Sequence, residues 1–221
     1  MKYHFKNIMY NTNRDNIIES ICKNKSVLHI GAADSPFTEL KISKNLLLHK
    51  KLESISSKLI GIDIDQNAIN YLKNHGINNI LNIDLMDDNI LKLEKFDVIV
   101  FGETIEHLNN IGFFLDRIKK LMHNNTLLVV STPNSRSFDQ ILGTLFGYEI
   151  IHEDHLVNFT YASLLQIMKR NGFDIETFYF TFLPREKHGI SLIISKILCF
   201  IRNGFSDTLL CVCKLKGDSQ L

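Results

Sequence analysis

The sequence lacks a strong excess of charge of either sign. Its 25 Lys and Arg residues are matched by 24 Asp and Glu residues, which gives a formal net charge of +1. Proteins that bind nucleic-acid backbones usually have an excess of basic residues or a row of them on one face, so a nucleic-acid partner is not favoured. The chain also contains no internal repeat, linker or low-complexity tract. Because 45% of its residues are hydrophobic, it is expected to fold around a core.

Paired cysteines and long apolar runs are also missing. None of the 4 cysteines belongs to a C-x-x-C pair, so buried, reduced thiols in a reducing compartment are the better interpretation. The longest apolar stretch, residues 190–201, is interrupted by Ser191, Ser195 and Lys196, and it is shorter than the ~20 residues that a membrane-spanning helix needs. No apolar segment typical of a secretory signal opens the chain. We therefore expect a cytoplasmic protein with no transmembrane segment.

The chain does contain a regular alternation of short apolar runs and amphipathic segments. The apolar runs predict seven strands, at residues 27–30, 59–62, 79–83, 96–101, 126–131, 174–181 and 207–214. Helical spacing predicts helices at 16–22, 46–59, 66–73, 113–122, 163–170 and 190–201. This order is typical of an α/β fold with a doubly wound, mostly parallel sheet. The last two strands are expected to form a hairpin-like edge around a helix, which makes the last strand antiparallel.

Four successive predicted strands end in a glycine or an acidic residue: Gly31, Asp63, Asp84 and Gly102-Glu103. In an open α/β sheet, ligands bind beyond the carboxyl ends of the strands. A glycine there lets the backbone approach a ligand closely. A carboxylate after the second strand can accept both hydroxyls of a ribose, and one after the third can accept the amine of an adenine. An acid that ends an apolar strand needs a partner, so this spacing predicts an adenosine pocket.

Six segments follow one another in a recognisable order: VLHIGAADS (27–35), GIDID (61–65), NIDLMD (82–87), FDVIVFGETIEHL (96–108), STPN (131–134) and HEDHLVNFTYASLLQIMKRNGF (152–173). Together they resemble the class I S-adenosylmethionine-dependent methyltransferases, in the branch that includes ubiquinone-type O-methyltransferases. The resemblance implies a Rossmann-like, doubly wound seven-stranded sheet with an antiparallel last strand, and S-adenosylmethionine as the cofactor. It implies one domain, 1–221, with a helical lead-in (1–26), a cofactor-binding core (27–173) and C-terminal strands and a helix that cover the acceptor side (174–221).

The resemblance also assigns the residues that contact the cofactor. Those predicted to do so are Gly31 and Ala32 under the methionine part, Asp63 and Ile64 at the ribose, Asp84 and Leu85 at the adenine, and Glu103 beside the methyl donor. The sequence departs from the family at His29, where an acid is usual, and at Ala33 and Ser35, where glycines are usual.

Glu103, Glu106 and His107 form an E-x-x-E-H block after the fourth strand. On a helix, positions i, i+3 and i+4 share a face, so these side chains are expected to converge beside the methyl donor. His107 is the first candidate for the general base and His155 the second, with Glu106 orienting one of them. Alternatively, the carboxylates favour a helix N-terminus and the histidine is structural.

A metal is a further alternative for this block. The small-RNA 2′-O-methyltransferases use a similar pattern, and imidazole and carboxylate groups suit several divalent ions, so His152 and His155 can complete such a site. We do not favour a metal here.

These observations predict methyl transfer to an unidentified small-molecule acceptor, with a hydroxyl of a small molecule, sugar or lipid precursor as the target. Residues 180–205 are expected to form the roof over that acceptor, with Arg185, Lys187, His188 and Lys196 among them. Two alternatives stay open. One is a non-catalytic S-adenosylmethionine-binding partner protein. The other, less favoured, is a nicotinamide-dependent oxidoreductase, which would need G-x-G-x-x-G where this chain has Gly31-Ala-Ala-Asp-Ser-Pro. The sequence does not predict an oligomeric state.

Overall fold

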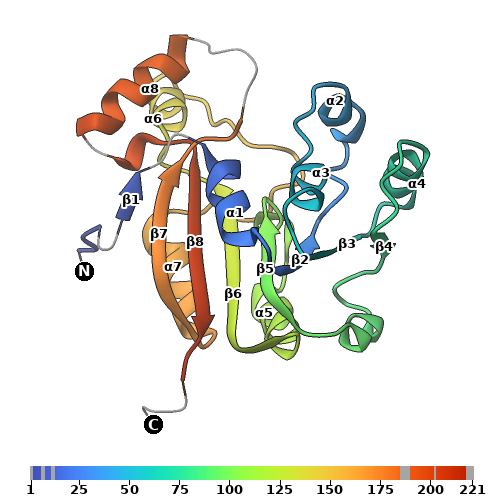
Figure 1. The fold of residues 1–221 in the computed structure, drawn as a ribbon. Coiled ribbons are helices and arrows are strands. Elements are labelled where there is room, and N and C mark those ends of the chain that lie inside the picture. The colour runs from blue at the N-terminus through green and yellow to red at the C-terminus, as the bar shows by residue number, and fades with distance from the viewer. Residues whose placement is uncertain (1, 6–7, 11–12, 185–189, 202, 218–221) are drawn as a thin grey trace.

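The structure is a computed structural model that describes residues 2–5, 8–10, 13–184, 190–201 and 203–217. Within them the strands form one eight-stranded sheet in the order β1-β7-β8-β6-β5-β2-β3-β4 (Figure 1). Neighbouring strands are parallel, except that β8 is antiparallel to both β6 and β7. The strands are β1 (Ile8–Tyr10), β2 (Ser26–Ile30), β3 (Lys58–Asp63), β4 (Ile80–Asn82), β5 (Phe96–Gly102), β6 (Met122–Pro133), β7 (Phe173–Thr181) and β8 (Thr208–Leu215).

Helices cover both faces of the sheet because successive strand residues point to opposite faces. In β5, Ile99 and Phe101 pack with α5 and α7, whereas Val98 and Val100 pack with α1 and α3. Burying each such side chain stabilises the fold by about 1.5–3 kcal/mol. The helices are α1 (Arg14–Cys22), α2 (Thr38–Ser43), α3 (Leu48–Glu53), α4 (Gln66–Asn74), α5 (Ile111–Lys120), α6 (Phe138–Leu145), α7 (Tyr161–Arg170) and α8 (Ile190–Ile201), with 3₁₀ turns η1 (Asp88–Lys92), η2 (Ile105–His107) and η3 (Asn203–Phe205).

The seven predicted strands are confirmed, together with the antiparallel direction of the last one. The last two strands pair with each other, but β8 lies between β6 and β7 rather than at the edge of the sheet. A short strand that was not predicted, β1, pairs in parallel with β7. The prediction of an edge at the last two strands is therefore wrong, because β1 covers β7.

Two helices, α2 and α6, were not predicted because neither has an inward-facing apolar stripe. The one buried residue of α2 is Thr38 and that of α6 is Gly143. The helix expected at 46–59 is shorter, since α3 ends at Glu53 and a turn follows in which Ile55 N donates to Leu52 O.

The helix expected at Glu103–His107 is also wrong. Glu103 has a φ of +47°, in the left-handed region that no regular right-handed helix contains. Helical geometry covers only the 3₁₀ turn η2, Ile105–His107. Glu103 therefore does not share a helix face with Glu106 and His107.

All four cysteines are buried free thiols, as predicted. Among the described residues, every helix is too short or too polar to cross a bilayer.

Candidate active site

The carboxyl ends of β2 and β5 meet at Gly31. Its φ is +72°, a conformation that glycine adopts readily, and a Cβ at this position would lie 2.6 Å from Thr104 Oγ1. The N–H groups of Gly31 and Ala32 both donate to Ile62 O, at 3.0 and 3.1 Å. Ala32 has no exposed surface, so neither its side chain nor its backbone is open to the solvent. The glycine is thus needed at the point where the β2 loop touches the turn after β5.

Asp63 ends β3 and holds two loops with its carboxylate. Its Oδ2 accepts a hydrogen bond from Ala33 N at 2.9 Å, and its Oδ1 accepts one from Asp65 N at 3.0 Å. The carboxylate therefore has protein partners that were not expected from the sequence. Each carboxylate oxygen can accept more than one hydrogen bond, so both can still accept from a ligand hydroxyl. Next to it, Ile64 leaves 71% of its surface exposed.

Asp84 lies at the same edge of the sheet, after β4. It is exposed, and its Oδ1 accepts a hydrogen bond from Met86 N at 2.8 Å. The following residue, Leu85, is buried in the core cluster shared by β2 and β5. Asn82 Nδ2 donates to Asp63 O at 3.2 Å, which ties the two loops together. Asp63 and Asp84 thus lie on adjacent strand ends, as their spacing predicted.

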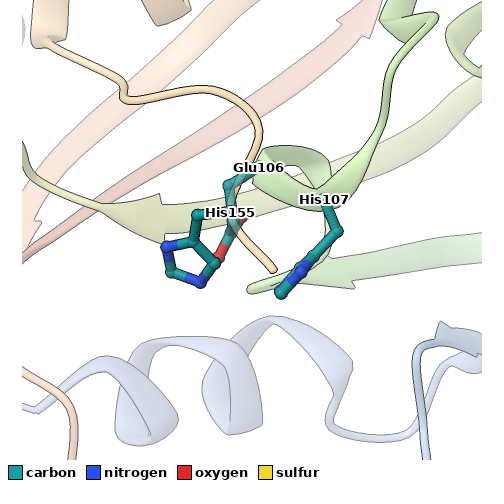
Figure 2. Close-up of side chains that lie close together, drawn as sticks. All are labelled: Glu106, His107 and His155. Atoms are coloured by element: carbon teal, nitrogen blue, oxygen red, sulfur yellow. The ribbon is translucent and has the colours of Figure 1, made fainter. Parts of the chain in front are cut away.

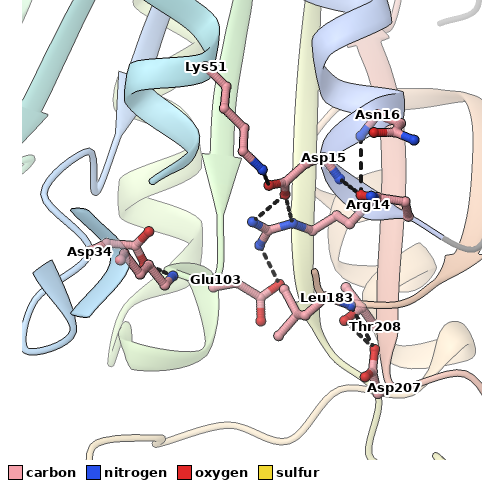
Figure 3. A network of polar contacts seen from close by, with 11 residues as sticks. Arg14, Asp15, Asn16, Asp34, Lys51, Glu103, Leu183, Asp207 and Thr208 are labelled. Atoms are coloured by element: carbon pink, nitrogen blue, oxygen red, sulfur yellow. Dashed lines mark hydrogen bonds and ion pairs between the residues drawn. The ribbon is translucent and has the colours of Figure 1, made fainter. Parts of the chain in front are cut away.

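A buried cation that the sequence analysis did not single out lies at this edge. Arg14, at the start of α1, is only 5% exposed. Its Nε and Nη2 atoms donate to Asp15 Oδ1 at 3.1 and 2.9 Å, and its Nη1 lies 3.5 Å from Glu103 Oε1 (Figure 3). Lys51 of α3 contacts the other carboxylate oxygen of Asp15 at 2.8 Å. Asp15 and Lys51 thus hold the guanidinium group so that one edge of it faces Glu103.

Glu103 faces this cation rather than the histidines. Its backbone N–H donates to Ser131 O at 2.9 Å, and its Oε1 is buried without a hydrogen bond. Burial raises the pKa of the Glu103 carboxyl, while the charge of Arg14 acts in the opposite direction. A guanidinium and a carboxylate that face each other without a tight hydrogen bond can bind a ligand that carries both charges.

Glu106 is 1% exposed and points into the molecule beneath the same edge. Thr132 Oγ1 donates to its Oε2 at 3.0 Å, and its Oε1 makes no hydrogen bond. Burial, followed by the charge of Glu103, raises the pKa of Glu106 to about 8. The backbone oxygen of Glu106 accepts from Leu156 N at 2.9 Å, which fastens the loop that carries His155 to the η2 turn.

His155 and His107 lie on either side of Glu106 (Figure 2). His155 Nε2 is 4.0 Å from Glu106 Oε1, and the centroids of the two imidazole rings are 4.7 Å apart. His107 Nδ1 lies 3.1 Å from Asp154 O. A carbonyl oxygen can only accept, so the hydrogen is on Nδ1 and the Nε2 of neutral His107 carries the free lone pair. The structure therefore brings the three predicted catalytic residues together and leaves Glu103 apart.

The same three side chains can also hold a cation by geometry. Each offers one ligand atom, and these atoms lie within 4.8 Å of one another. Of the other residues weighed for a metal, Glu103 faces Arg14, and His152 Nδ1 lies 3.6 Å from Asp154 Oδ2. The raised pKa of Glu106 means that a proton competes with a cation for its carboxylate at neutral pH.

A cavity of about 240 Å³ lies where β6 and β7 end. Its lining includes four aromatic side chains, Tyr3, Phe5, Tyr161 and Phe180, together with Arg136. These residues come from the N-terminal segment, α7, β7 and the loop after β6. Of the residues expected to form a roof over the acceptor, Arg185, Lys187 and His188 lie outside the described residues, whereas Lys196 Nζ lies 5.8 Å from the centroid of the Phe182 ring.

A family model described as a methyltransferase domain matches residues 10–177. A ubiquinone biosynthesis O-methyltransferase of Pelagibacter ubique is 30% identical over 129 residues, which cover 55% of this chain and 53% of that protein. The protein of the same name from Bradyrhizobium diazoefficiens is 31% identical over 108 residues, covering 48% and 42%. The chain thus spans about half the length of the curated relatives it matches. A SAM dependent methyltransferase structure from Archaeoglobus fulgidus shares the fold, with a TM-score of 0.57, 18% identity and coverage of 90% of this chain and 94% of that one.

Proposed function

The chain belongs to the methyltransferase domain family, and from this premise we propose that it transfers the methyl group of S-adenosylmethionine to a hydroxyl of a small-molecule acceptor, such as a sugar or lipid precursor. One observation carries the proposal. The residues suited to an adenosyl cofactor and the histidine suited to proton removal lie at the same edge of the sheet. Gly31 packs against Thr104, and Thr104 directly precedes the η2 turn that carries Glu106 and His107.

The residues at the strand ends fit S-adenosylmethionine chemically. Asp63 and Asp84 offer acceptors to ribose hydroxyls and an adenine amine, and Gly31 lets the β2 loop pack against Thr104 at the same edge of the sheet. The methionine part carries one carboxylate and one ammonium group. Arg14 would pair with the carboxylate and Glu103 with the ammonium, which would give the buried Oε1 of Glu103 the hydrogen bond it lacks.

The donor supplies a methyl group that is already activated by a positively charged sulfur. The protein then has to hold an acceptor oxygen in line with it, and good alignment can contribute about 7–11 kcal/mol. His107 Nε2 would take the proton of the acceptor hydroxyl, which typically accelerates transfer by about 10²–10⁴-fold. Asp154 O fixes the tautomer of His107, and the neighbouring Glu106 would orient His155.

The curated relatives named above support an oxygen as the methyl acceptor, because their printed names are those of O-methyltransferases. The aromatic walls of the cavity at the ends of β6 and β7 suit an acceptor with apolar or aromatic parts. The balanced net charge gives no support to a nucleic-acid acceptor.

Two measurements test this function. Calorimetry should detect binding of S-adenosylmethionine and its demethylated product but not of NAD or NADP. Transfer of a labelled methyl group should then occur to hydroxylated aromatic, sugar or lipid-precursor acceptors, and should fail with a matched acceptor that lacks the hydroxyl. Donor binding with no transfer to any acceptor would favour the non-catalytic alternative, and nicotinamide binding would favour the oxidoreductase.

A further inference from the structure

The cavity at the ends of β6 and β7, which we call the aromatic cavity, has walls of two kinds. One wall is aromatic: the Phe5 ring centroid lies 5.2 Å from that of Tyr161 and 5.0 Å from that of Phe180, edge to face in both pairs. The other wall consists of Asn134 and Arg136 from the loop after β6 and of the residues that begin α7. The volume is about 240 Å³, and an apolar cavity of about 150 Å³ holds one benzene molecule. The aromatic cavity therefore has room for one substituted ring.

Asn134 fixes the backbone on the polar side of the aromatic cavity. It belongs to the STPN segment, and it is only 3% exposed. Its Nδ2 donates to Gly204 O at 2.9 Å and to Ser206 O at 2.8 Å, and its Oδ1 accepts from Arg136 N at 3.0 Å. Because this buried amide holds the backbone of Arg136, the arginine side chain extends from a fixed point on the cavity wall.

Two side chains of the lining keep hydrogen-bond donors that no described residue accepts from. The guanidinium group of Arg136 forms no ion pair or side-chain hydrogen bond within the part of the chain that the structure describes. The hydroxyl of Tyr3 accepts from Gln166 Nε2, which leaves its own hydrogen free to donate. The hydroxyl of Thr160, by contrast, is used in the cap of α7, where it accepts from Ser163 N at 3.2 Å. The aromatic cavity thus offers free donors and a positive charge.

This charge indicates an anionic ligand. Among the described residues that line the cavity, Arg136 is the one charged side chain, and none is a carboxylate. A guanidinium group pairs with a carboxylate or a phosphate through two parallel hydrogen bonds. The first turn of α7 lies in the same wall, and the positive end of its dipole acts in the same direction. We propose that the aromatic cavity binds a flat ring that carries a carboxylate or phosphate group, and that Arg136 selects the charge.

Two chain segments connect the aromatic cavity to the active site. Thr132, whose Oγ1 donates to Glu106 Oε2 at 3.0 Å, lies four residues before Arg136. Leu156, whose N–H donates to Glu106 O at 2.9 Å, lies four residues before Thr160. Four residues span at most about 14 Å even when fully extended. The ligand, if the proposed function holds, is therefore the distal part of an elongated methyl acceptor, whose hydroxyl lies at the general base while its anionic ring lies in the cavity.

Binding of small probes to the full chain tests the site without methyl transfer. Benzoate and phenyl phosphate should each bind about fivefold or more tightly than benzamide, a neutral ring, which is the gain expected from an ion pair with a partly exposed guanidinium group. Acetate, which lacks the ring, should bind more weakly than benzoate. Protein-observed NMR titrations give each Kd and should shift the backbone signals of Arg136 and Ala162, which line the cavity.

Three variants separate the charge from the ring. Arg136→Met should bind benzoate and benzamide with about equal Kd. Its matched control, Arg170→Met, removes the same charge from the exposed C-terminal end of α7 and should keep the preference for benzoate. Phe5→Leu removes a ring from the aromatic wall and should weaken both probes alike. Circular dichroism of each variant checks the fold.

The proposal is overturned if benzoate and phenyl phosphate bind no more tightly than benzamide, if Arg136→Met keeps the preference, or if Arg170→Met loses it as well. Its link to the acceptor has a separate test. With an acceptor that the enzyme methylates, benzoate should raise the KM for the acceptor and leave the KM for the donor unchanged. A raised donor KM, or no inhibition, would show that the cavity is not part of the acceptor site. The probe titrations contain no methyl donor, so a negative result there leaves the proposed function untouched.

Discussion

Arg14 Nη1 and Glu103 Oε1 lie 3.5 Å apart, although both side chains are largely buried and oppositely charged. A tight charge-assisted hydrogen bond between such groups is typically about 2.7–2.9 Å long. The Nε and Nη2 atoms of Arg14 donate to Asp15, so the guanidinium group is held in place without a short hydrogen bond to Glu103. This spacing suits a ligand with separate positive and negative groups, and it joins the start of α1 to the end of β5.

We expect Arg14→Met to weaken S-adenosylmethionine binding by about tenfold or more, since a hydrogen bond to a charged group contributes about 1.5–3 kcal/mol. Isothermal calorimetry measures the change in Kd. Lys51→Met is the control, because it removes a charge from the same network without facing Glu103. Equal losses in both variants would mean that the network acts through the stability of α1 and α3, and not through a contact with the donor.

Asp63→Asn should also weaken donor binding by about tenfold or more, because an amide offers one acceptor oxygen where a carboxylate offers two. One of the two loop contacts, from Ala33 N or Asp65 N, can survive in the variant. Asp65→Asn serves as the control at the neighbouring acid, which caps α4, because asparagine is an equally good cap. An unchanged Kd for Asp63→Asn would remove this residue from the cofactor site.

Much of this arrangement could be predicted from the sequence because strands buried on both faces leave continuous apolar runs. The ends of those runs located Gly31, Asp63 and Asp84 at one edge of the sheet, where the structure also has them. The E-x-x-E-H spacing selected Glu106 and His107, and the segment that begins at His152 supplied His155; the structure brings these three together.

The direction of Glu103 and the role of Arg14 could not be predicted, because they depend on contacts between residues that are far apart in the sequence. The E-x-x-E-H spacing suggests one helix face, but Glu103 adopts a positive φ and turns toward a cation from the first helix. Arg14 gives no local signal: it follows the cap residue Asn13, where a basic residue usually faces solvent. Helix α8 shows the same limit, because Ile193 and Ile197 are 50% and 58% exposed and helical periodicity identifies an apolar face but not what that face contacts.

If His107 is the general base, its loss should slow methyl transfer without weakening binding of the methyl donor. We expect His107→Ala to bind the donor with an unchanged Kd and to slow methyl transfer by about 10²–10⁴-fold, as the loss of a general base does. Single-turnover rates with an acceptor that the unmodified enzyme methylates provide the measurement. His152→Ala is the control, because the His152 ring centroid lies 6.4 Å from that of His107 but His152 is not part of the three-residue group. Full turnover by His107→Ala would show that another group takes the proton.

A chelator should leave methyl transfer unchanged at pH 7. Glu106, with its pKa raised to about 8 by burial and by Glu103, holds a proton that a metal would have to displace. Turnover measured with and without EDTA tests this. Activity that EDTA abolishes and that Mg²⁺ or Mn²⁺ restores would show that Glu106, His107 and His155 bind a metal ion.

A pair of buried histidines behind the β2 loop should make stability depend on pH. His29 Nδ1 lies 3.2 Å from His49 Nδ1, and His49 Nε2 lies 3.1 Å from Asn79 Oδ1. Since the amide oxygen accepts, His49 donates from Nε2 and its Nδ1 accepts from His29, an arrangement that requires the His49 ring to be neutral. Burial lowers the pKa of His49 to about 4, and burial together with the charge of His49 lowers the pKa of His29.

Below the ordinary histidine pKa of about 6.5, His29 and His49 bind protons in the unfolded chain but stay neutral in the folded chain. The free energy of unfolding should therefore be highest above that pH and fall as the pH drops toward about 4, by up to about 1.4 kcal/mol per pH unit for each histidine. Urea unfolding followed by circular dichroism measures it, as the chain has 0 Trp residues. His29→Gln stays neutral throughout and should flatten this slope, whereas the exposed His75→Gln should not. The same slope in all three proteins would mean that other groups, and not this pair, titrate with folding.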